Sequence, residues 1–220
     1  MPEALAADLA ALAESTDALG ATLDSLDDGQ ARRPSLLPGW SVGHVLTHVA
    51  RNADGMVNLV EWALTGVPAP MYPSVEARTA DIEAGAGRPA VELADDVRRS
   101  AARLADSLAL LGAAGPQALD RLLLFGPPQP GADPDTPARA LPYARRREVE
   151  IHHVDLGLAY GPADWPADFV ERTLLFLHSR SGAVDAVGQP SDVLAWRLGR
   201  PPVGPVRRRD GSDAGEPPPW

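Results

Sequence analysis

The segment REVEIHHVDLG (residues 147–157) carries two glutamates, two histidines and an aspartate among apolar residues. Successive residues of an α-helix are turned by about 100°, so Glu148, His152 and Asp155 fall within about 60° of one another. Apolar side chains flank this stripe on both sides, which predicts that Glu148 and His152 point into a helical core. A buried carboxylate and imidazole cost free energy unless they are paired or bind a metal. The alternative is a structural Glu–His hydrogen bond.

The other charged residues near this segment fall elsewhere on the same helix. Glu150 and His153 lie about 140–200° from Glu148, on an open arc. We expect them to be solvated or peripheral, and dispensable for metal binding. The arginines at 145–147 are expected to form a mostly solvated helix face that precedes the site. The alternative is that these arginines bind the carboxylate of a ligand.

A second histidine pair stands in WSVGHVLTHVARNADGMVNLV (residues 40–60). His48 lies at the edge of the apolar face of this predicted helix, and His44 lies about 40° further toward solvent. Taken alone, a histidine at the edge of a core is usually a satisfied structural residue. Together with Glu148 and His152, however, His48 makes a three-ligand set for a divalent metal with a fourth position open. Zinc fits this set best, and Ni, Co, Mn or Fe bind similar groups.

Apolar spacing predicts four long amphipathic helices in the first 160 residues, at about 2–26, 41–66, 89–111 and 142–160. This pattern predicts a mainly α protein built on a four-helix bundle, whose core is a common place for metal sites. We expect one domain at 1–161 and a reduced C-terminal segment at 162–220 with an irregular tail. The crossing at 71–90 is expected to hold a short helix, and the apolar run at 121–126 a strand. Further helices are expected at 164–179 and 191–198.

Composition and charge exclude several classes of function. The net charge of -10 argues against nucleic acid as a partner. The chain has no cysteine, so any thiol chemistry must use a thiol from outside. The first residues do not read as a secretory signal, and apolar runs are too short to span a membrane. We therefore expect a cytoplasmic protein, as a monomer or a homodimer, that acts on small molecules.

Three segments together resemble a known family. They are PGWSVGHVLTHVARNADGMVNLV (38–60), YPSVEARTADIEAGAGRPA (72–90) and REVEIHHVDLG. They are similar to the mycothiol-dependent maleylpyruvate isomerases, within the DinB-like (YfiT-like) superfamily of metal-binding four-helix bundles, over about residues 1–160. The resemblance implies metal ligands at His48, Glu148 and His152, the same three residues that the helical faces indicate. It also implies that Arg78 handles the substrate, and the alternative is an exposed loop arginine.

The resemblance implies a thiol-dependent chemistry. Mycothiol would arrive as a cosubstrate, and a divalent metal, Zn²⁺ above all, would bind and deprotonate it. The thiolate would add to the cis double bond of maleylpyruvate, and rotation followed by loss of the thiol would give fumarylpyruvate. Related enzymes use the activated thiolate as S-transferases toward other electrophiles. A cationic Arg78 would hold a substrate carboxylate.

The C-terminal segment leaves two further classes of function open. Family members carry a C-terminal α/β domain, and the stretch at 179–188 is shorter than its strands require, so we expect a short, truncated α/β appendage. Strict maleylpyruvate isomerase activity depends on whether that appendage completes a cleft. One alternative is a non-catalytic metal-binding or regulatory protein on the same bundle. Another is a hydrolase that uses a metal-bound water.

Overall fold

The computed structural model describes residues 3–126 and 131–217. The chain divides into two compact units, Met1–Leu156 and Gly157–Trp220. None of the helices in these described residues is both long and apolar enough to cross a membrane.

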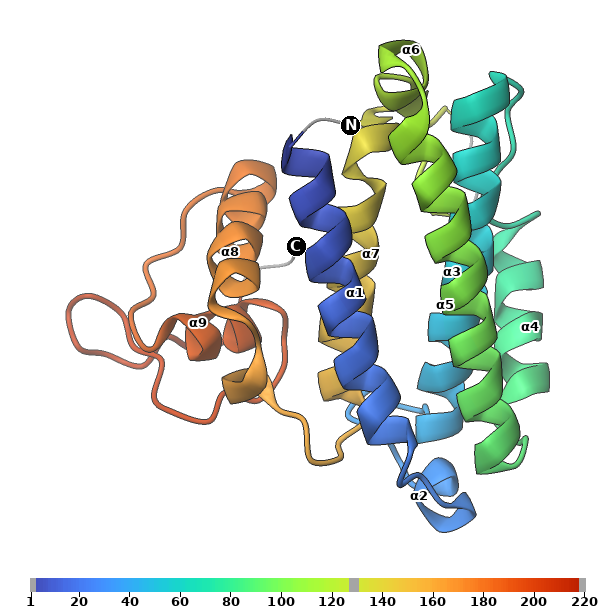
Figure 1. Ribbon diagram of the computed structural model, residues 1–220. Helices are drawn as coiled ribbons and strands as arrows, with labels where there is room; N and C mark the ends of the chain where they lie inside the picture. Colours follow the sequence, from blue (N-terminus) through green and yellow to red (C-terminus); the bar gives the residue numbers. More distant parts are fainter. Residues whose placement is uncertain (1–2, 127–130, 218–220) are drawn as a thin grey trace. The chain divides into compact units, whose positions relative to one another are not determined.

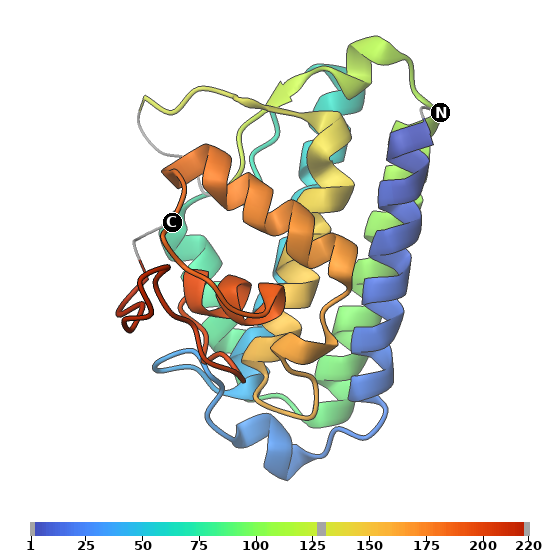
Figure 2. The same ribbon diagram turned by 90° about the vertical axis from the view of Figure 1, so that its left-hand side faces the viewer.

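The first unit is a bundle of four long helices, which confirms the predicted architecture (Figures 1 and 2). They are α1 (Glu3–Leu23), α3 (Val42–Thr65), α5 (Ala90–Ala113) and α7 (Leu141–Asp155). In Figure 1, α3 and α5 run in one direction while α1 and α7 run in the other. The apolar faces predicted from the sequence form the core, where Leu19, Leu46, Leu93 and Leu141 are at most 2% exposed.

Shorter elements connect the long helices. They are α2 (Asp28–Arg32), α4 (Val75–Ala86), α6 (Pro116–Leu119), β1 (Leu122–Leu123), β2 (Thr136–Pro137) and a 3-10 turn, η1 (Ala138–Ala140). Helix α4 is the short helix expected in the crossing, and β1 falls in the apolar run where a strand was expected. β1 pairs antiparallel with β2, Leu122 opposite Pro137 and Leu123 opposite Thr136. The proline- and glycine-rich segment 127–137 is typical of a loop from its sequence, and part of it lies outside the described residues. Helix α7 ends at Asp155, earlier than predicted, just before Gly157 turns to a φ of +62°.

Helix α3 begins at a capping box that also determines the position of His44. Ser41, the N-cap of the helix, accepts a hydrogen bond from the His44 backbone N–H at 3.3 Å. The Ser41 backbone N–H in turn donates to Nδ1 of the His44 side chain at 3.1 Å. His44 is therefore held at the start of the helix, and His48 is one turn further in. The helix ends at Gly66, which has a φ of +80°.

Two glycines let α4 lie close against α3. A Cβ on Gly43 would come within 2.1 Å of the Ala86 carbonyl oxygen, and a Cβ on Gly85 would come within 2.4 Å of the Thr47 side chain. Only residues without a side chain fit at such an approach. The close packing brings the start of α4, which carries Arg78, beside the face of α3 that carries His48.

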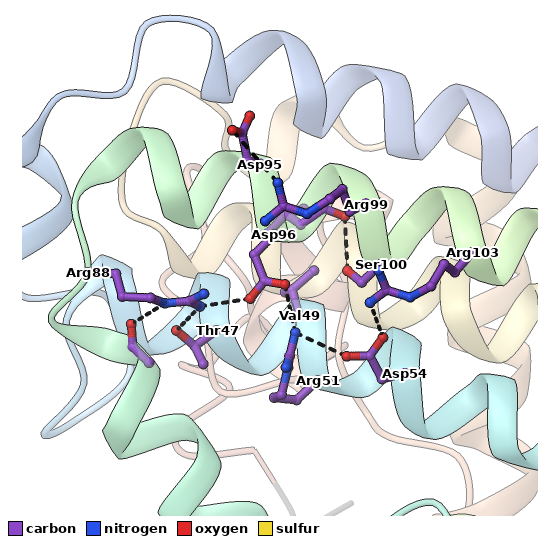
Figure 3. Close-up of polar contacts among 12 residues, drawn as sticks. Thr47, Val49, Arg51, Asp54, Arg88, Asp95, Asp96, Arg99, Ser100 and Arg103 are labelled. Atoms are coloured by element: carbon purple, nitrogen blue, oxygen red, sulfur yellow. Dashed lines mark hydrogen bonds and ion pairs between the residues drawn. The ribbon is translucent and has the colours of Figure 1, made fainter.

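Ion pairs link α3 to α5 and to the turn before α5 (Figure 3). Asp96 on α5 is 7% exposed. It accepts hydrogen bonds from Arg51 of α3 at 2.7 Å and from Arg88 at 2.8 Å. Arg51 also pairs with Asp54 at 3.0 Å, and Asp54 pairs with Arg103 of α5. Asp96 is thus the buried acceptor on which two partly buried guanidinium groups depend.

The second unit contains α8 (Ala167–Ser181), α9 (Pro190–Arg197) and a short 3-10 turn, η2 (Pro162–Asp164). Both helices were predicted, at slightly different bounds. Phe169 of α8 and Leu194 of α9 are buried. The Asp192 carboxylate accepts from the backbone N–H groups of Val203 at 2.8 Å and Gly204 at 2.9 Å. β pairing within 157–217 consists of isolated bridges, at Val187–Arg207 and Arg207–Asp213.

Substitution of Asp96 tests the link between α3 and α5. Asp96→Ala leaves Arg51 and Arg88 without their buried acceptor, and we expect the free energy of unfolding to fall by about 2 kcal/mol. Asp95→Ala is the matched control, because Asp95 is 51% exposed on its side chain and its arginine contacts are 3.9–4.0 Å long. We expect a change within about 0.5 kcal/mol there. Urea unfolding measures both variants, and equal effects would contradict the role given to Asp96.

Candidate metal centre

His48 of α3 and Glu148 and His152 of α7 come together in the structure. Each offers one ligand atom, and these atoms lie within 4.8 Å of one another. Glu148 Oε2 is 3.3 Å from His48 Nε2 and 3.6 Å from His152 Nε2. The two Nε2 atoms are 3.1 Å apart. The structure therefore assembles, as one group, the three residues that the sequence predicts as metal ligands.

Helix geometry and a tryptophan hold this group in place. Glu148 and His152 are four residues apart, so they share one stripe of α7 and face α3. His48 is 5% exposed. The Trp40 ring, just before α3, lies edge-on to the His48 ring with a centroid distance of 5.7 Å. Trp40 thus covers the histidine, a role that the sequence pattern did not indicate.

Asp155 orients the His152 ring. Its Oδ2 is 2.9 Å from His152 Nδ1, and its side chain is fully buried. A carboxylate at one ring nitrogen keeps the proton there, so the lone pair of the other nitrogen faces the ligand group. Asp155 falls on the same stripe as Glu148 and His152, three residues beyond His152. That spacing is the signal by which sequence reasoning could have assigned this role.

Arg78 of α4 stands directly behind His48. Its Nη2 is 3.1 Å from His48 Nδ1. A guanidinium can only donate, so Nδ1 is the acceptor in any hydrogen bond that this contact makes. Arg78 also lies over the Tyr72 ring, with its Cζ 5.7 Å from the ring centroid. Arg78 is therefore no isolated surface arginine, because it is in contact with a member of the histidine–glutamate group.

The electrostatics of the group follow from burial and from mutual hydrogen bonds. Burial lowers the pKa of His48, against the opposing effect of the hydrogen bond that His48 donates to Glu148. Burial alone would also lower the pKa of His152, but hydrogen bonds to Asp155 and Glu148 outweigh it and raise that pKa. Burial would raise the pKa of Glu148, yet hydrogen bonds from His152 and His48 hold it well below its usual range. Glu148 is thus an anion at neutral pH, between two imidazoles.

The remaining histidines and acids of the two segments do not join the group. His44 is committed to the capping box, and its Nε2 is 3.3 Å from Glu83. Glu150 and His153 are each 1% exposed, so the prediction that they are solvated was wrong. The arc that carries them faces α1. There Glu150 accepts from Ser15 Oγ at 2.6 Å, and His153 Nε2 is 2.7 Å from Thr22 Oγ1.

The expectation of a solvated arginine face was also wrong for two of the three arginines. Arg145 is 2% exposed and Arg146 is 3% exposed. Arg145 Nη1 donates to the Val49 carbonyl at 3.0 Å and to Asn52 Oδ1 at 2.7 Å. Arg146 Nε donates to Ser15 Oγ at 3.1 Å. Both side chains are buried because α3 and α1 pack on the two sides of α7 and offer acceptors there.

The bundle and the composition of this group define a mainly α protein of the DinB-like class. A family model described as the mycothiol maleylpyruvate isomerase N-terminal domain matches residues 12–157. The chain belongs to this family.

Solved structures agree with this assignment. A crystal structure of the mycothiol-dependent maleylpyruvate isomerase aligns with 100% of this chain and 98% of its own, at 27% identity and a TM-score of 0.84. A crystal structure of a histidine-to-alanine mutant of the mycothiol-dependent maleylpyruvate isomerase aligns over the same shares, at 27% identity and a TM-score of 0.83. A search of curated protein sequences found no match.

The raised pKa of His152 predicts how metal affinity depends on pH. Without metal, this imidazole keeps its proton to a higher pH than the roughly 6.5 of a free histidine. A metal must displace that proton, so the apparent affinity for Zn²⁺ is expected to rise as the pH passes the raised pKa and to level off above it. The lowered pKa of His48 keeps His48 neutral over the same range.

The Asp155→Asn variant tests whether the raised pKa of His152 causes this pH dependence of zinc affinity. The amide removes the carboxylate that raises the pKa of His152, so the rise in affinity should move to lower pH. Competition with a chromophoric chelator between about pH 5.5 and 8.5 covers the titration range of histidine. A profile that is the same in the variant and the wild type would contradict the role assigned to Asp155.

Proposed function

We propose that this protein is a metal-dependent isomerase that uses mycothiol to convert maleylpyruvate into fumarylpyruvate. The observation that carries the proposal is the group formed by His48, Glu148 and His152 in a chain that belongs to the mycothiol maleylpyruvate isomerase family. Similarity to the crystal structure of the mycothiol-dependent maleylpyruvate isomerase extends along the whole chain, which supports the same reaction.

The donor set fits a divalent metal. Two imidazole nitrogens and one carboxylate oxygen face one another from buried or half-buried side chains, and Asp155 presents the free lone pair of His152 to the group. Zn²⁺ binds such sets and leaves a fourth position open. When bound, it would supply a Lewis acid that lowers the pKa of a thiol ligand.

The chain's own residues would supply the remaining functions. The protein has no cysteine, so the attacking thiolate comes from the cosubstrate. Arg78 is 3.1 Å from His48 and brings a positive charge to the edge of the group. There its planar guanidinium can hold a substrate carboxylate by two parallel hydrogen bonds. The Trp40 ring beside His48 covers one side of the ligand group.

Metal analysis of alanine variants tests the ligand assignment. His48→Ala and His152→Ala should each abolish stoichiometric Zn²⁺ binding, because an open site with three protein ligands is left with only two. His153→Ala, the matched control on the same helix, should keep the metal. It should instead lower the free energy of unfolding by about 2 kcal/mol, since it removes a buried, hydrogen-bonded ring. Loss of metal in His153→Ala and retention in His152→Ala would overturn the assignment.

Turnover of maleylpyruvate with and without mycothiol tests the reaction. We expect isomerisation only when the thiol is present. Arg78→Lys should keep the metal but raise KM by about tenfold or more, because lysine cannot form the two parallel bonds. Arg99→Lys, a surface control whose side chain is 63% exposed, should behave as wild type. Turnover of a substrate without thiol would favour a hydrolase, and bound metal without any turnover would favour a binding protein.

A further inference from the structure

A pocket of about 700 Å³ lies between α1 and α5, and none of the three candidate metal ligands lines it. Its size is within the range of small-molecule pockets in proteins, about 300–1,000 Å³. Most of its lining is apolar, with buried leucines between the two helices and exposed alanines along their edges. These leucines are Leu12, Leu104 and Leu108, and the alanines include Ala13, Ala102 and Ala105.

Arg145 of α7 also lines this α1–α5 pocket, although it is only 2% exposed. The other charged residues of the lining, Asp17, Asp24 and Arg98, are exposed. Burial lowers the pKa of Arg145 to about 10, against the attraction of Glu148, so the guanidinium is a cation at neutral pH. A buried charge is costly unless an opposite charge pairs with it. Among the residues that the structure describes, no carboxylate forms an ion pair with Arg145.

The fold uses only one nitrogen of this guanidinium. Nη1 donates to the Val49 carbonyl at 3.0 Å and to Asn52 Oδ1 at 2.7 Å, which accounts for both of its N–H groups. Within residues 3–126 and 131–217, Nε and Nη2 have no acceptor, and neither atom is sealed from solvent. These two nitrogens share one edge of the guanidinium plane, where they form a fork that can bind both oxygens of a carboxylate. Arg145 is therefore anchored to α3 through Nη1, and its fork is available to a ligand in the pocket.

We propose that the α1–α5 pocket binds a small monocarboxylate with an apolar body, such as a medium-chain fatty acid. Its carboxylate pairs with Nε and Nη2 of Arg145, and its hydrocarbon chain lies along the leucines and alanines of α1 and α5. Charge and polarity select this ligand, because a buried cation without an anion stands beside apolar walls. A second carboxylate would lie near the exposed Asp17 and Asp24, which repel it. The site is separate from the metal centre and does not depend on the proposed function.

A series of eight-carbon ligands tests the chemistry of the pocket in the zinc-loaded wild type. Octanoate, 1-octanol and octylamine share one hydrocarbon chain and differ in the charge of the head group. We expect octanoate to bind about tenfold more tightly than 1-octanol in calorimetry, as for a hydrogen bond between charged groups, and octylamine to bind most weakly. Equal affinity for octanoate and 1-octanol, or no binding of octanoate, would overturn the inference.

A bulky substitution tests where octanoate binds. Ala13→Trp fills the pocket from α1, so we expect the affinity for octanoate to fall at least tenfold while the zinc content stays the same. Ala18→Trp is the matched control, because Ala18 is an exposed alanine of the same helix that does not line the pocket. It should bind octanoate as wild type does. If Ala13→Trp keeps wild-type affinity, octanoate binds elsewhere, for example at the metal centre, and the inference fails.

Substitution of the arginine tests the anion-binding group. Arg145→Met keeps the length of the side chain and removes its charge, so octanoate and 1-octanol should bind with similar affinity. Retained binding of 1-octanol shows that the pocket is still formed. Arg99→Met, at a side chain that is 63% exposed, should keep the preference for octanoate. A tenfold preference that persists in Arg145→Met would contradict the role of Arg145. If this variant does not fold, the ligand series and Ala13→Trp decide the question.

A second copy of the chain is the competing occupant of the pocket. Light scattering over a range of protein concentrations detects it. We expect any self-association to be the same in Ala13→Trp and Ala18→Trp. A dimer that Ala13→Trp abolishes and Ala18→Trp retains, together with no binding of octanoate, would assign the pocket to self-association and overturn the inference.

Discussion

The structure depends on one half-buried carboxylate, Glu148, between two imidazoles. A carboxylate that is partly shielded from water is stabilised when its charge is compensated at close range. Here His152 supplies one partner from the same helix, and His48 supplies the other from α3. The second contact exists only while α3 and α7 keep their mutual position. Many contacts in the surrounding bundle therefore serve to hold α3 and α7 in register.

Several local features serve that register. The capping box sets where α3 begins, and so where His48 stands along it. Glycines on α3 and α4 allow an approach that brings Arg78 behind His48. Arg145 ties the middle of α7 to the backbone of α3, and Asp155 fixes the ring of His152. Farther out, the ion pairs around Asp96 join α3 to α5. Each of these contacts fixes a helix or a side chain near the Glu148 carboxylate.

Periodicity in the sequence was enough to predict the bundle and the three clustered residues. The long helices carry apolar residues at regular spacing, and a polar pair between two apolar flanks, as at Glu148 and His152, can only face a neighbour. The same reasoning failed for Glu150, His153, Arg145 and Arg146. A helix wheel shows which side chains share a face, but it does not show how many neighbours cover the helix. Because α1 and α3 both pack on α7, an arc that looked open is buried as well.

The sequence alone could not predict roles that depend on contacts between distant segments. Nothing in the sequence marks Asn52 as special, and its contact with the buried Arg145 forms only because α7 packs on α3. Asp155 is an intermediate case. Its spacing from His152 could have indicated an orienting carboxylate, but burial on α7 was needed to establish the contact.

Anomalous diffraction from crystals of the zinc-loaded protein would show where the metal binds. We expect one ion within about 2.0–2.2 Å of Nε2 of His48, Nε2 of His152 and a carboxylate oxygen of Glu148, with one position left for an exogenous ligand. An anomalous peak elsewhere in the bundle, or one coordinated by Glu150 or His153, would contradict it.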